Sequence, residues 1–297
     1  MENDIKEKLP SIRENVRLAP YTTFNIGGEA KYFLEVEERE QLIEAIEVSK
    51  ENNIPFFILG KGSNLLISDE GFNGLVIKVN FKKINVEGER VVCGAGVLLN
   101  KLVKRLTEES LLDLEWAIGI PGTVGGAIRG NAGAFGGSMI DNILEVEVLR
   151  LNPEIEIRKY NKEELKVDYR DSIFKKEKNV VIISASFNFK KGNKEEIEKK
   201  VSEYLNYRKE KHPVSFPSAG SIFKNPQDKS AGELIEKCGL KGKKIGGAKI
   251  SEKHSNFIIN IGNAEAKDVL DLISLAKKEV KDKLGIELEE EIELVGF

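Results

Sequence analysis

Histidine and cysteine are scarce in this sequence, with two of each among its 297 residues. The histidines, His212 and His254, do not have the spacing of a histidine metal site such as HxxxH. Cys93 and Cys238 lie far apart in the chain and form no CxxC pair, which argues against a disulfide framework or a zinc site. We therefore expect no bound metal, and a chemistry that depends on Ser, Arg, Lys, Glu and Asp or on a bound cofactor.

Long apolar runs and a strong excess of one charge are absent as well. No run approaches the roughly 18 apolar residues of a membrane-spanning helix. The first residues, MENDIKEKLPSIREN, are charged and lack the apolar core of a secretory signal. The formal net charge is −3, with both signs interspersed, so no basic surface for nucleic acid is indicated. These features predict a cytoplasmic protein that neither inserts into a membrane nor binds nucleic acid.

Short β-rich runs alternate with helical patterns along the chain. Apolar and β-branched runs between Gly, Asn and Pro predict strands at 31–36, 55–60, 74–79, 90–96, 143–151 and 179–189. Apolar residues at helical spacing predict helices over 38–52, 98–110, 194–210 and 264–284. The stretch SAGELIEKCG predicts another helix, with Ser230 as its N-cap and Gly239 as its left-handed stop. The sequence therefore predicts an α+β fold, with a larger domain to about residue 190 and a smaller one after it.

Two glycine-rich segments are candidates for a cofactor site. The first, ILGKGSNLL (58–66), is an apolar strand that runs into Gly60 and Gly62. The second, GIPGTVGGAIRGNAGAFGG (119–137), holds eight glycines in nineteen residues. Glycine lets backbone N–H groups approach a phosphate closely, although neither segment is a GxGxxG or a Walker motif. Ordinary turns are the alternative in both places, but the pair of segments favours one diphosphate-bearing cofactor held between two subdomains.

The order of several longer motifs identifies a family resemblance. GKGSNLL, AIGIPGTVGGAIRGNAGAFGG, YRDSIF, PSAGSIFKNP, IGGAKISEKHSNFIIN and LEEEIELVG occur in the order found in the UDP-N-acetylenolpyruvoylglucosamine reductase (MurB) family. The resemblance runs from YTTFNIGGEAKYF to the C-terminus. It implies a two-subdomain FAD-binding fold of the vanillyl-alcohol-oxidase (PCMH) type plus a smaller α+β substrate-binding domain. We expect the subdomains at 1–82 and 83–192, and the substrate-binding domain at 193–297, with its C-terminal segment returning to the active site.

The resemblance also implies the reaction. NADPH reduces the FAD, and flavin N5 then delivers a hydride to the enolpyruvyl group of UDP-N-acetylglucosamine enolpyruvate. The product is UDP-N-acetylmuramate, a peptidoglycan precursor. The spacing of the motifs leaves no room for the tyrosine-bearing loop of longer relatives, so the chain resembles the shorter type, and we expect a monomer. By the family's motifs, the cofactor contacts are Gly60, Lys61, Gly62, Ser63, Asn64, Leu65, Pro121, Gly122, Thr123, Gly125, Gly126, Ala127, Asn131, Gly133 and Ala134.

Two residues are similar to the family's proton donor and catalytic arginine. Ser221 corresponds to the proton donor; a nucleophilic serine is disfavoured because no histidine lies nearby in sequence and the GxSxG elbow is absent. A plain turn serine is the remaining alternative. Arg170, in YRDSIF, corresponds to the arginine that would hold the substrate carboxylate and stabilise the enolate. Its alternative is a surface pair with Asp168 or Asp171.

The C-terminal LEEEIELVG adds a carboxylate, and the family pattern selects Glu291. Strand alternation would put Glu289, Glu291 and Glu293 on one face, so periodicity alone does not single it out, and a solvated charge run is the alternative. Many relatives have Arg at the position of Glu293. The resemblance implies substrate contacts at Lys211, Asn225, Lys229 and His254. For His254 a structural core role stays open, and for Lys229 a solvated one.

Two other functions are compatible with parts of the sequence. A flavin oxidase of the same fold would share the glycine segments but would not need SAGSIFKNP or the C-terminal glutamate. Such oxidases often tether flavin through His or Cys; the only cysteine in the first 190 residues, Cys93, lies outside the glycine segments, so we expect non-covalent FAD. A flavin- or nucleotide-binding regulator without turnover would predict loss of Ser221, Arg170 and Glu291, and all three are present.

Overall fold

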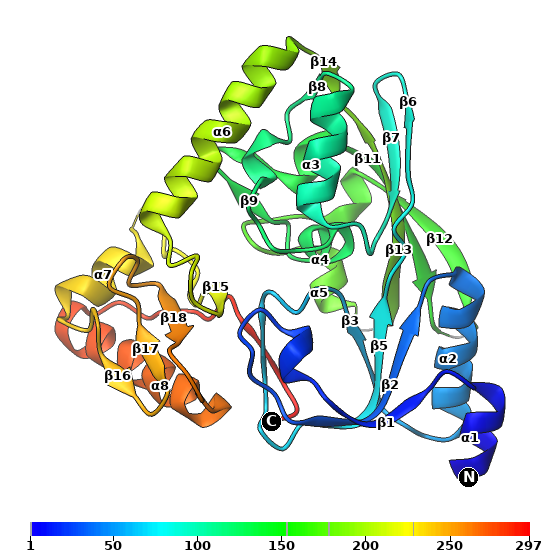
Figure 1. The fold of residues 1–297 in the computed structure, drawn as a ribbon, viewed down its shortest axis with the longest axis horizontal. Coiled ribbons are helices and arrows are strands. Elements are labelled where there is room, and N and C mark those ends of the chain that lie inside the picture. The colour runs from blue at the N-terminus through cyan, green and yellow to red at the C-terminus, as the bar shows by residue number, and fades with distance from the viewer. Residues whose placement is uncertain (1, 153, 178, 228) are drawn as a thin grey trace. The chain divides into compact units, whose positions relative to one another are not determined.

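The computed structural model describes residues 2–152, 154–177, 179–227 and 229–297. The chain divides into two compact units, each assembled from three segments (Figure 1). Unit 1 comprises Met1–Ile12, Leu34–Lys61 and Val76–Asn206, and unit 2 comprises Arg13–Phe33, Gly62–Leu75 and Tyr207–Phe297. The division into three consecutive domains at residues 82 and 192 stays a prediction.

Unit 1 is built on an antiparallel five-stranded sheet in the order β12-β11-β13-β7-β6. Its strands are β6 (Ile84–Glu87), β7 (Arg90–Gly94), β11 (Ile143–Arg150), β12 (Glu156–Asn161) and β13 (Val180–Asn188). Apolar residues such as Val146, Val148 and Phe187 are buried, so these strands contribute to the core. The short helix α4 (Val124–Arg129) packs on β13 and β7 and so brings the second glycine-rich segment to this sheet.

Further elements complete the N-terminal two thirds of the chain. A second sheet has the order β1-β2-β5-β3. Its strands are β1 (Arg13–Arg17), β2 (Glu29–Val36), β3 (Phe56–Leu59) and β5 (Phe72–Val79). The helices are α1 (Glu2–Lys8), η1 (Ala19–Tyr21), α2 (Arg39–Glu51), α3 (Leu99–Glu108), η2 (Glu115–Ala117), η3 (Met139–Asn142), η4 (Glu163–Leu165), α5 (Ile173–Lys176) and α6 (Lys194–Lys211). Two small antiparallel pairs are β8 (Leu111–Leu112) with β14 (Lys190–Lys191) and β9 (Gly133–Ala134) with β10 (Gly137–Ser138).

Unit 2 has its own antiparallel sheet, in the order β15-β18-β17-β16, against which α8 packs (Figure 1). Its strands are β15 (Ser218–Ser221), β16 (Lys244–Ile245), β17 (Ala248–Ile250) and β18 (Phe257–Asn260). Its helices are α7 (Ala231–Lys237) and α8 (Ala266–Leu284). One face of α8, with Val269, Leu272 and Ile273, is buried in the core of this unit. The last strand, β19 (Glu293–Val295), runs parallel to β4 (Leu65–Ile67).

The predicted fold class and the strongly patterned elements are confirmed. The helices expected at 38–52, 98–110, 194–210 and 264–284 are α2, α3, α6 and α8. The Ser230 cap of α7 is present, since its hydroxyl accepts the N–H of Glu233 at 3.3 Å, and Gly239 has the expected left-handed φ of 78°. The sequence did not predict α4, because glycine has a low helix propensity. Among the described residues, no helix combines the length and apolar composition that a membrane span needs.

Candidate active site

The second glycine-rich segment is held mainly by the chain itself. Thr123 caps α4, and its Oγ1 accepts the N–H of Gly126 at 3.3 Å. The N–H of Gly125 donates to the carbonyl of Ala95 at 2.9 Å, and a Cβ on Gly125 would lie 2.9 Å from the Ala95 Cβ. Close packing of turns therefore accounts for part of this glycine content. Pro121, Gly122 and Ala127 lie on the same segment, before and within α4.

The two glycine-rich segments meet inside unit 1. A Cβ on Gly60, directly after β3, would lie 2.7 Å from Thr123 Oγ1, so only glycine allows this approach. Gly126 differs, because it is exposed and its nearest neighbour, Thr123 Oγ1, would be 3.5 Å from an added Cβ. Bare backbone at Gly126, not required by packing, leaves room for a ligand, and the exposed Lys61 adds a cation next to Gly60. These residues fit an FAD diphosphate.

The remaining part of the first segment lies in unit 2. Gly62 has φ +64°, and a Cβ there would lie 2.4 Å from the carbonyl oxygen of Tyr21. Asn64 binds the C-terminal segment: its Nδ2 donates to the Glu291 carbonyl at 2.9 Å, and its own carbonyl accepts the Glu293 N–H at 2.9 Å. Ser63 is half-buried beside it, and Leu65 begins β4. Asn64 therefore has a structural role that the sequence did not reveal.

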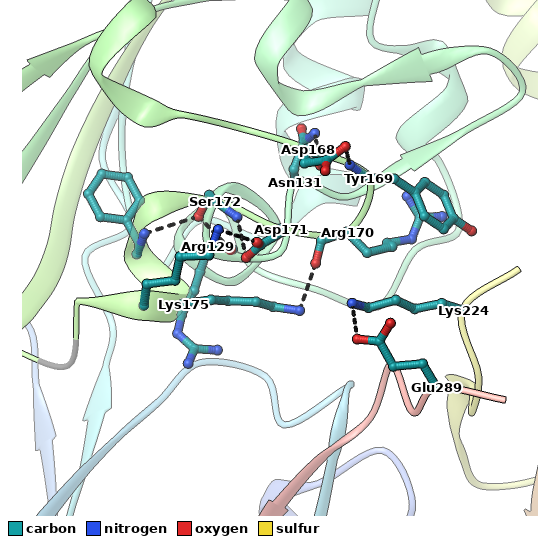
Figure 2. Close-up of polar contacts among 12 residues, drawn as sticks. Arg129, Asn131, Asp168, Tyr169, Arg170, Asp171, Ser172, Lys175, Lys224 and Glu289 are labelled. Carbon is teal, nitrogen blue, oxygen red and sulfur yellow. Dashed lines mark hydrogen bonds and ion pairs between the residues drawn. The ribbon is translucent and has the colours of Figure 1, made fainter. Parts of the chain in front are cut away.

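Arg170 contacts the predicted cofactor segment within unit 1. Its Nη2 donates to the carbonyl of Gly133 at 2.7 Å, and Gly133 and Ala134 form one arm of the β9–β10 hairpin. Asn131, which is buried, donates through Nδ2 to the Asp168 carbonyl at 3.0 Å (Figure 2). The structure thus brings Arg170 together with two predicted cofactor residues.

Asp171, one of the two alternative surface partners of Arg170, has a lysine partner. The Asp171 carboxylate pairs with Lys176 at 2.8 Å, and this ammonium holds the pKa of Asp171 below its usual range. Arg170 has a left-handed backbone, with φ +56°, in a tight turn closed by hydrogen bonds between Asp168 and Asp171. Lys175 Nζ donates to the Arg170 carbonyl at 2.8 Å. Lys175 was not predicted, because nothing in the sequence distinguishes it from Lys176.

Ser221 ends β15 in unit 2, next to the C-terminal segment. It is half-buried and follows Gly220, whose φ is +77°, at a bulge in the pairing of β15 with β18. The next residue, Ile222, accepts the N–H of Glu291 on its carbonyl at 2.8 Å. The backbone segments that carry Ser221 and Glu291 therefore lie side by side.

The four C-terminal carboxylates differ in their partners. Glu289 pairs with Lys224 (Figure 2), and Glu290 pairs with Lys277 at 2.7 Å. Lys224, which follows Ser221 by three residues, thus binds a carboxylate of the C-terminal segment. Glu289 and Glu290 thus each have a lysine partner within the chain, and Glu291 stays the carboxylate that the family pattern selects.

The four predicted substrate contacts all lie in unit 2. Lys211 pairs with Glu210 at 2.8 Å, and Asn225 Oδ1 accepts the Ala231 N–H at 3.0 Å at the start of α7. Lys229 is exposed. Lys211 is therefore an exposed residue with a carboxylate partner, and Asn225 stabilises the start of α7.

His254 has a defined tautomer. Its Nδ1 accepts the N–H of Asn256 at 3.2 Å, so the proton of the neutral ring lies on Nε2, and burial lowers its pKa. The His212 ring packs edge-on at 5.5 Å, and burial, together with repulsion from His254 and Arg208, lowers the pKa of His212 to about 4. The two histidines of the chain therefore form one neutral pair, a feature that their scarcity alone did not reveal.

A separate cavity in unit 1 contains none of the predicted site residues. Its volume is about 670 Å³, and Trp116, Phe135 and Tyr204 are among its lining residues. It borders the end of the second glycine-rich segment, since Phe135, Gly136 and Gly137 line it, but Arg170 is not among its lining residues.

Comparisons with known proteins place the chain in a family. Residues 212–295 match the model of the UDP-N-acetylenolpyruvoylglucosamine reductase C-terminal domain, and residues 30–156 match that of an FAD binding domain. The reductase of Clostridium novyi is 43% identical over 99% of this chain and 97% of its own length. That of Caldanaerobacter subterraneus subsp. tengcongensis is 46% identical over 95% of this chain and 93% of its own length.

Solved structures agree. The crystal structure of the UDP-N-acetylenolpyruvylglucosamine reductase (MurB) from Thermus caldophilus matches with a TM-score of 0.83 and 39% identity, over 96% of this chain and 99% of that one. The Bermuda grass isoallergen BG60 shares the fold alone, with a TM-score of 0.51 and 11% identity over 98% of this chain and 61% of that one. The expected FAD-binding fold of the vanillyl-alcohol-oxidase type is confirmed. The chain belongs to the UDP-N-acetylenolpyruvoylglucosamine reductase family.

Proposed function

We propose that this protein is the NADPH-dependent FAD reductase that converts UDP-N-acetylglucosamine enolpyruvate to UDP-N-acetylmuramate in peptidoglycan precursor synthesis. The observation that supports this most directly is the pairing of Glu291 N–H with the Ile222 carbonyl at 2.8 Å. This bond joins the C-terminal segment that carries Glu291 to the residue after Ser221. A proton donor and a residue that orients the substrate must lie close together, and the two backbone segments meet that requirement.

FAD would be held non-covalently by the glycine segments, with room for the diphosphate beside Gly126 and the Lys61 cation near it. When bound, it supplies the hydride that the reduction needs. The protein's own residues bind and orient the substrate and control the proton.

Ser221 would give its hydroxyl proton to the carbon next to the substrate carboxylate. A hydroxyl is a weak acid, so the carbon must carry substantial negative charge at that moment, and nearby N–H donors must stabilise the resulting alkoxide. The turn at Gly220 and the half-buried setting support this role, because they constrain the backbone that carries the hydroxyl and leave the side chain partly exposed.

Arg170 would bind the substrate carboxylate and stabilise the charge that develops on it. A guanidinium carries five N–H donors, so its bond to the Gly133 carbonyl is compatible with a two-point grip on a carboxylate. Glu291 would orient the reacting end of the substrate. The Nε2–H of His254 would donate to a diphosphate oxygen, with Lys211, Asn225 and Lys229 along the rest of the nucleotide sugar.

The test separates the two half-reactions under anaerobic conditions in a stopped-flow instrument. The purified holoenzyme is reduced with one equivalent of NADPH and then mixed with UDP-N-acetylglucosamine enolpyruvate, while the visible flavin band is followed. Rapid return of the oxidised spectrum is expected. If the band does not return, the assignment of this substrate is wrong; bleaching of the oxidised enzyme by an unmodified sugar would indicate an oxidase.

Ser221→Ala tests the proton donor. We expect reduction by NADPH to stay within about twofold of the parent and reoxidation by substrate to slow by roughly 100-fold or more. Ser218→Ala, on the same strand, is the matched control and should behave like the parent in both steps. Equal slowing of both half-reactions in Ser221→Ala would show that Ser221 is not the proton donor.

A further inference from the structure

Arg170 occupies a backbone position that favours glycine. The N–H of Asp171 donates to the Asp168 carbonyl at 3.2 Å, which closes a turn with Tyr169 and Arg170 at its centre. Arg170 has φ +56°, whereas Tyr169 is not among the residues with positive φ. This is the pattern of a type II turn, in which glycine or asparagine is preferred at the position of Arg170. A strained arginine at a predicted catalytic position indicates that its side chain is needed there and that the surroundings hold it.

Several contacts fix the ends of this turn. Asp168 and Asp171 exchange a second backbone bond of 3.1 Å, and Asn131 Nδ2 donates to the Asp168 carbonyl at 3.0 Å. Ser172 Oγ donates to the Arg129 carbonyl at 2.7 Å (Figure 2). These bonds anchor the residues on either side of the turn but do not by themselves determine the conformation of Arg170.

Lys175 acts on Arg170 itself. It lies on α5, whose first turn is capped by Ser172, and helical side chains lean back toward the preceding turn. The Lys175 Nζ accordingly reaches the Arg170 carbonyl at 2.8 Å, as Figure 2 shows. Its neighbour Lys176 points elsewhere, to the Asp171 carboxylate, and is 70% exposed. A charge-assisted bond to a carbonyl fixes the orientation of that peptide group.

We propose that Lys175 is a positioning residue: by binding the Arg170 carbonyl it holds Arg170 in its left-handed conformation and aims the guanidinium. The guanidinium has defined contacts at the other end of the side chain. Its Nη2 donates to the Gly133 carbonyl, and its carbon lies 5.0 Å from the centre of the Tyr169 ring. The inference rests on the proposed function of Arg170 as the residue that binds the substrate carboxylate.

The kinetic test uses Lys175→Met, which keeps an unbranched side chain of similar length and removes the donor. Reoxidation of the reduced holoenzyme by substrate should slow roughly 10–100-fold, as expected for a misplaced catalytic group, while reduction by NADPH stays within about twofold. Lys175→Arg, which retains a donor, should recover part of the rate. Lys176→Met is the matched control and should resemble the parent. Parent-like reoxidation in Lys175→Met would overturn the proposal.

A stability test needs no turnover. Melting temperatures of the FAD-loaded parent, Lys175→Met, Arg170→Gly and the double variant form a double-mutant cycle. Because glycine adopts positive φ readily, Lys175→Met should lower the melting temperature clearly with Arg at position 170 and much less with Gly there. Equal loss in both backgrounds would overturn the proposal. If the parent is not reoxidised by the substrate, the proposed function fails, and this cycle still decides whether Lys175 restrains Arg170.

Discussion

The side chains predicted to act on substrate are positioned through their main chains. Arg170 is held at its carbonyl by Lys175, and Ser221 follows a left-handed glycine. Glu291 is held at its N–H by the Ile222 carbonyl and at its carbonyl by the Asn64 side-chain amide. Fixing the backbone leaves the functional atoms of a residue available for substrate while limiting where they can lie. Such preorganisation is the usual source of electrostatic stabilisation in enzymes.

The lowered pKa of His212, which packs against His254, predicts how the free energy of unfolding depends on pH. Burial lowers the pKa of His212 to about 4, below the usual value near 6.5 in the unfolded chain. Between these pH values His212 binds more protons in the unfolded chain than in the folded protein. The contribution of neutral His212 to the free energy of unfolding is therefore complete above about pH 6.5 and is lost as the pH falls toward 4. The free energy of unfolding should therefore drop between about pH 7 and pH 5, with His212 accounting for on the order of 1 kcal/mol after allowance for its partial exposure.

Urea unfolding of His212→Phe and His212→Gln at both pH values measures this contribution. Both variants remove the titrating group, but only Phe preserves the ring against His254 and Phe257. We expect the free energy of unfolding to fall less between pH 7 and pH 5 in both variants than in the parent. A pH dependence as steep as that of the parent would show that His212 does not carry it.

At the scale of elements, the close approach of β3 to α4 depends on the absence of a side chain at Gly60. Gly60→Ala would place a Cβ 2.7 Å from Thr123 Oγ1, the atom that also caps α4. We expect a loss of about 1–2 kcal/mol in the free energy of unfolding and a lower content of bound FAD, measured from the ratio of flavin to protein absorbance.

Gly130→Ala is the control for this substitution. Gly130 ends α4 with φ −93°, and an added Cβ would lie 3.6 Å from its nearest neighbour, an ordinary contact. Its stability should change by less than about 0.5 kcal/mol. If Gly60→Ala behaves like Gly130→Ala in both measurements, the two glycine segments do not depend on close contact at this point.

The elements that sequence periodicity predicted are those with a strong local signal. The stripe of α8, with Val269, Leu272 and Ile273, is an example. The pairing of β19 with β4 joins Glu293 to Leu65, and no local pattern specifies such a distant partner. In the candidate site, motif resemblance selected Arg170, but Lys175 became recognisable only through its contact with the Arg170 carbonyl.

At the scale of the whole molecule, unit 2 is assembled from distant parts of the chain. Thr23 Oγ1 donates to the Ser218 carbonyl at 2.8 Å, and Asn260 Nδ2 donates to the Phe24 carbonyl at 3.2 Å. The segment 13–33 therefore belongs with residues from 207 onward. Composition shows where a chain changes character but not which distant segments pack together, so the sequence alone did not reveal these contacts.

Removal of FAD tests the cofactor assignment on the whole chain. A ligand that binds only the folded state stabilises it by RT ln(1 + [L]/Kd), about 2.7 kcal/mol at a free concentration 100 times the dissociation constant. The apoprotein should therefore melt several degrees below the holoenzyme, and added FAD should restore the melting temperature. Riboflavin, which lacks the diphosphate, should restore little, because the cation of Lys61 is proposed to bind that group in the space beside Gly126. Equal restoration by riboflavin would show that the glycine segments do not hold the diphosphate.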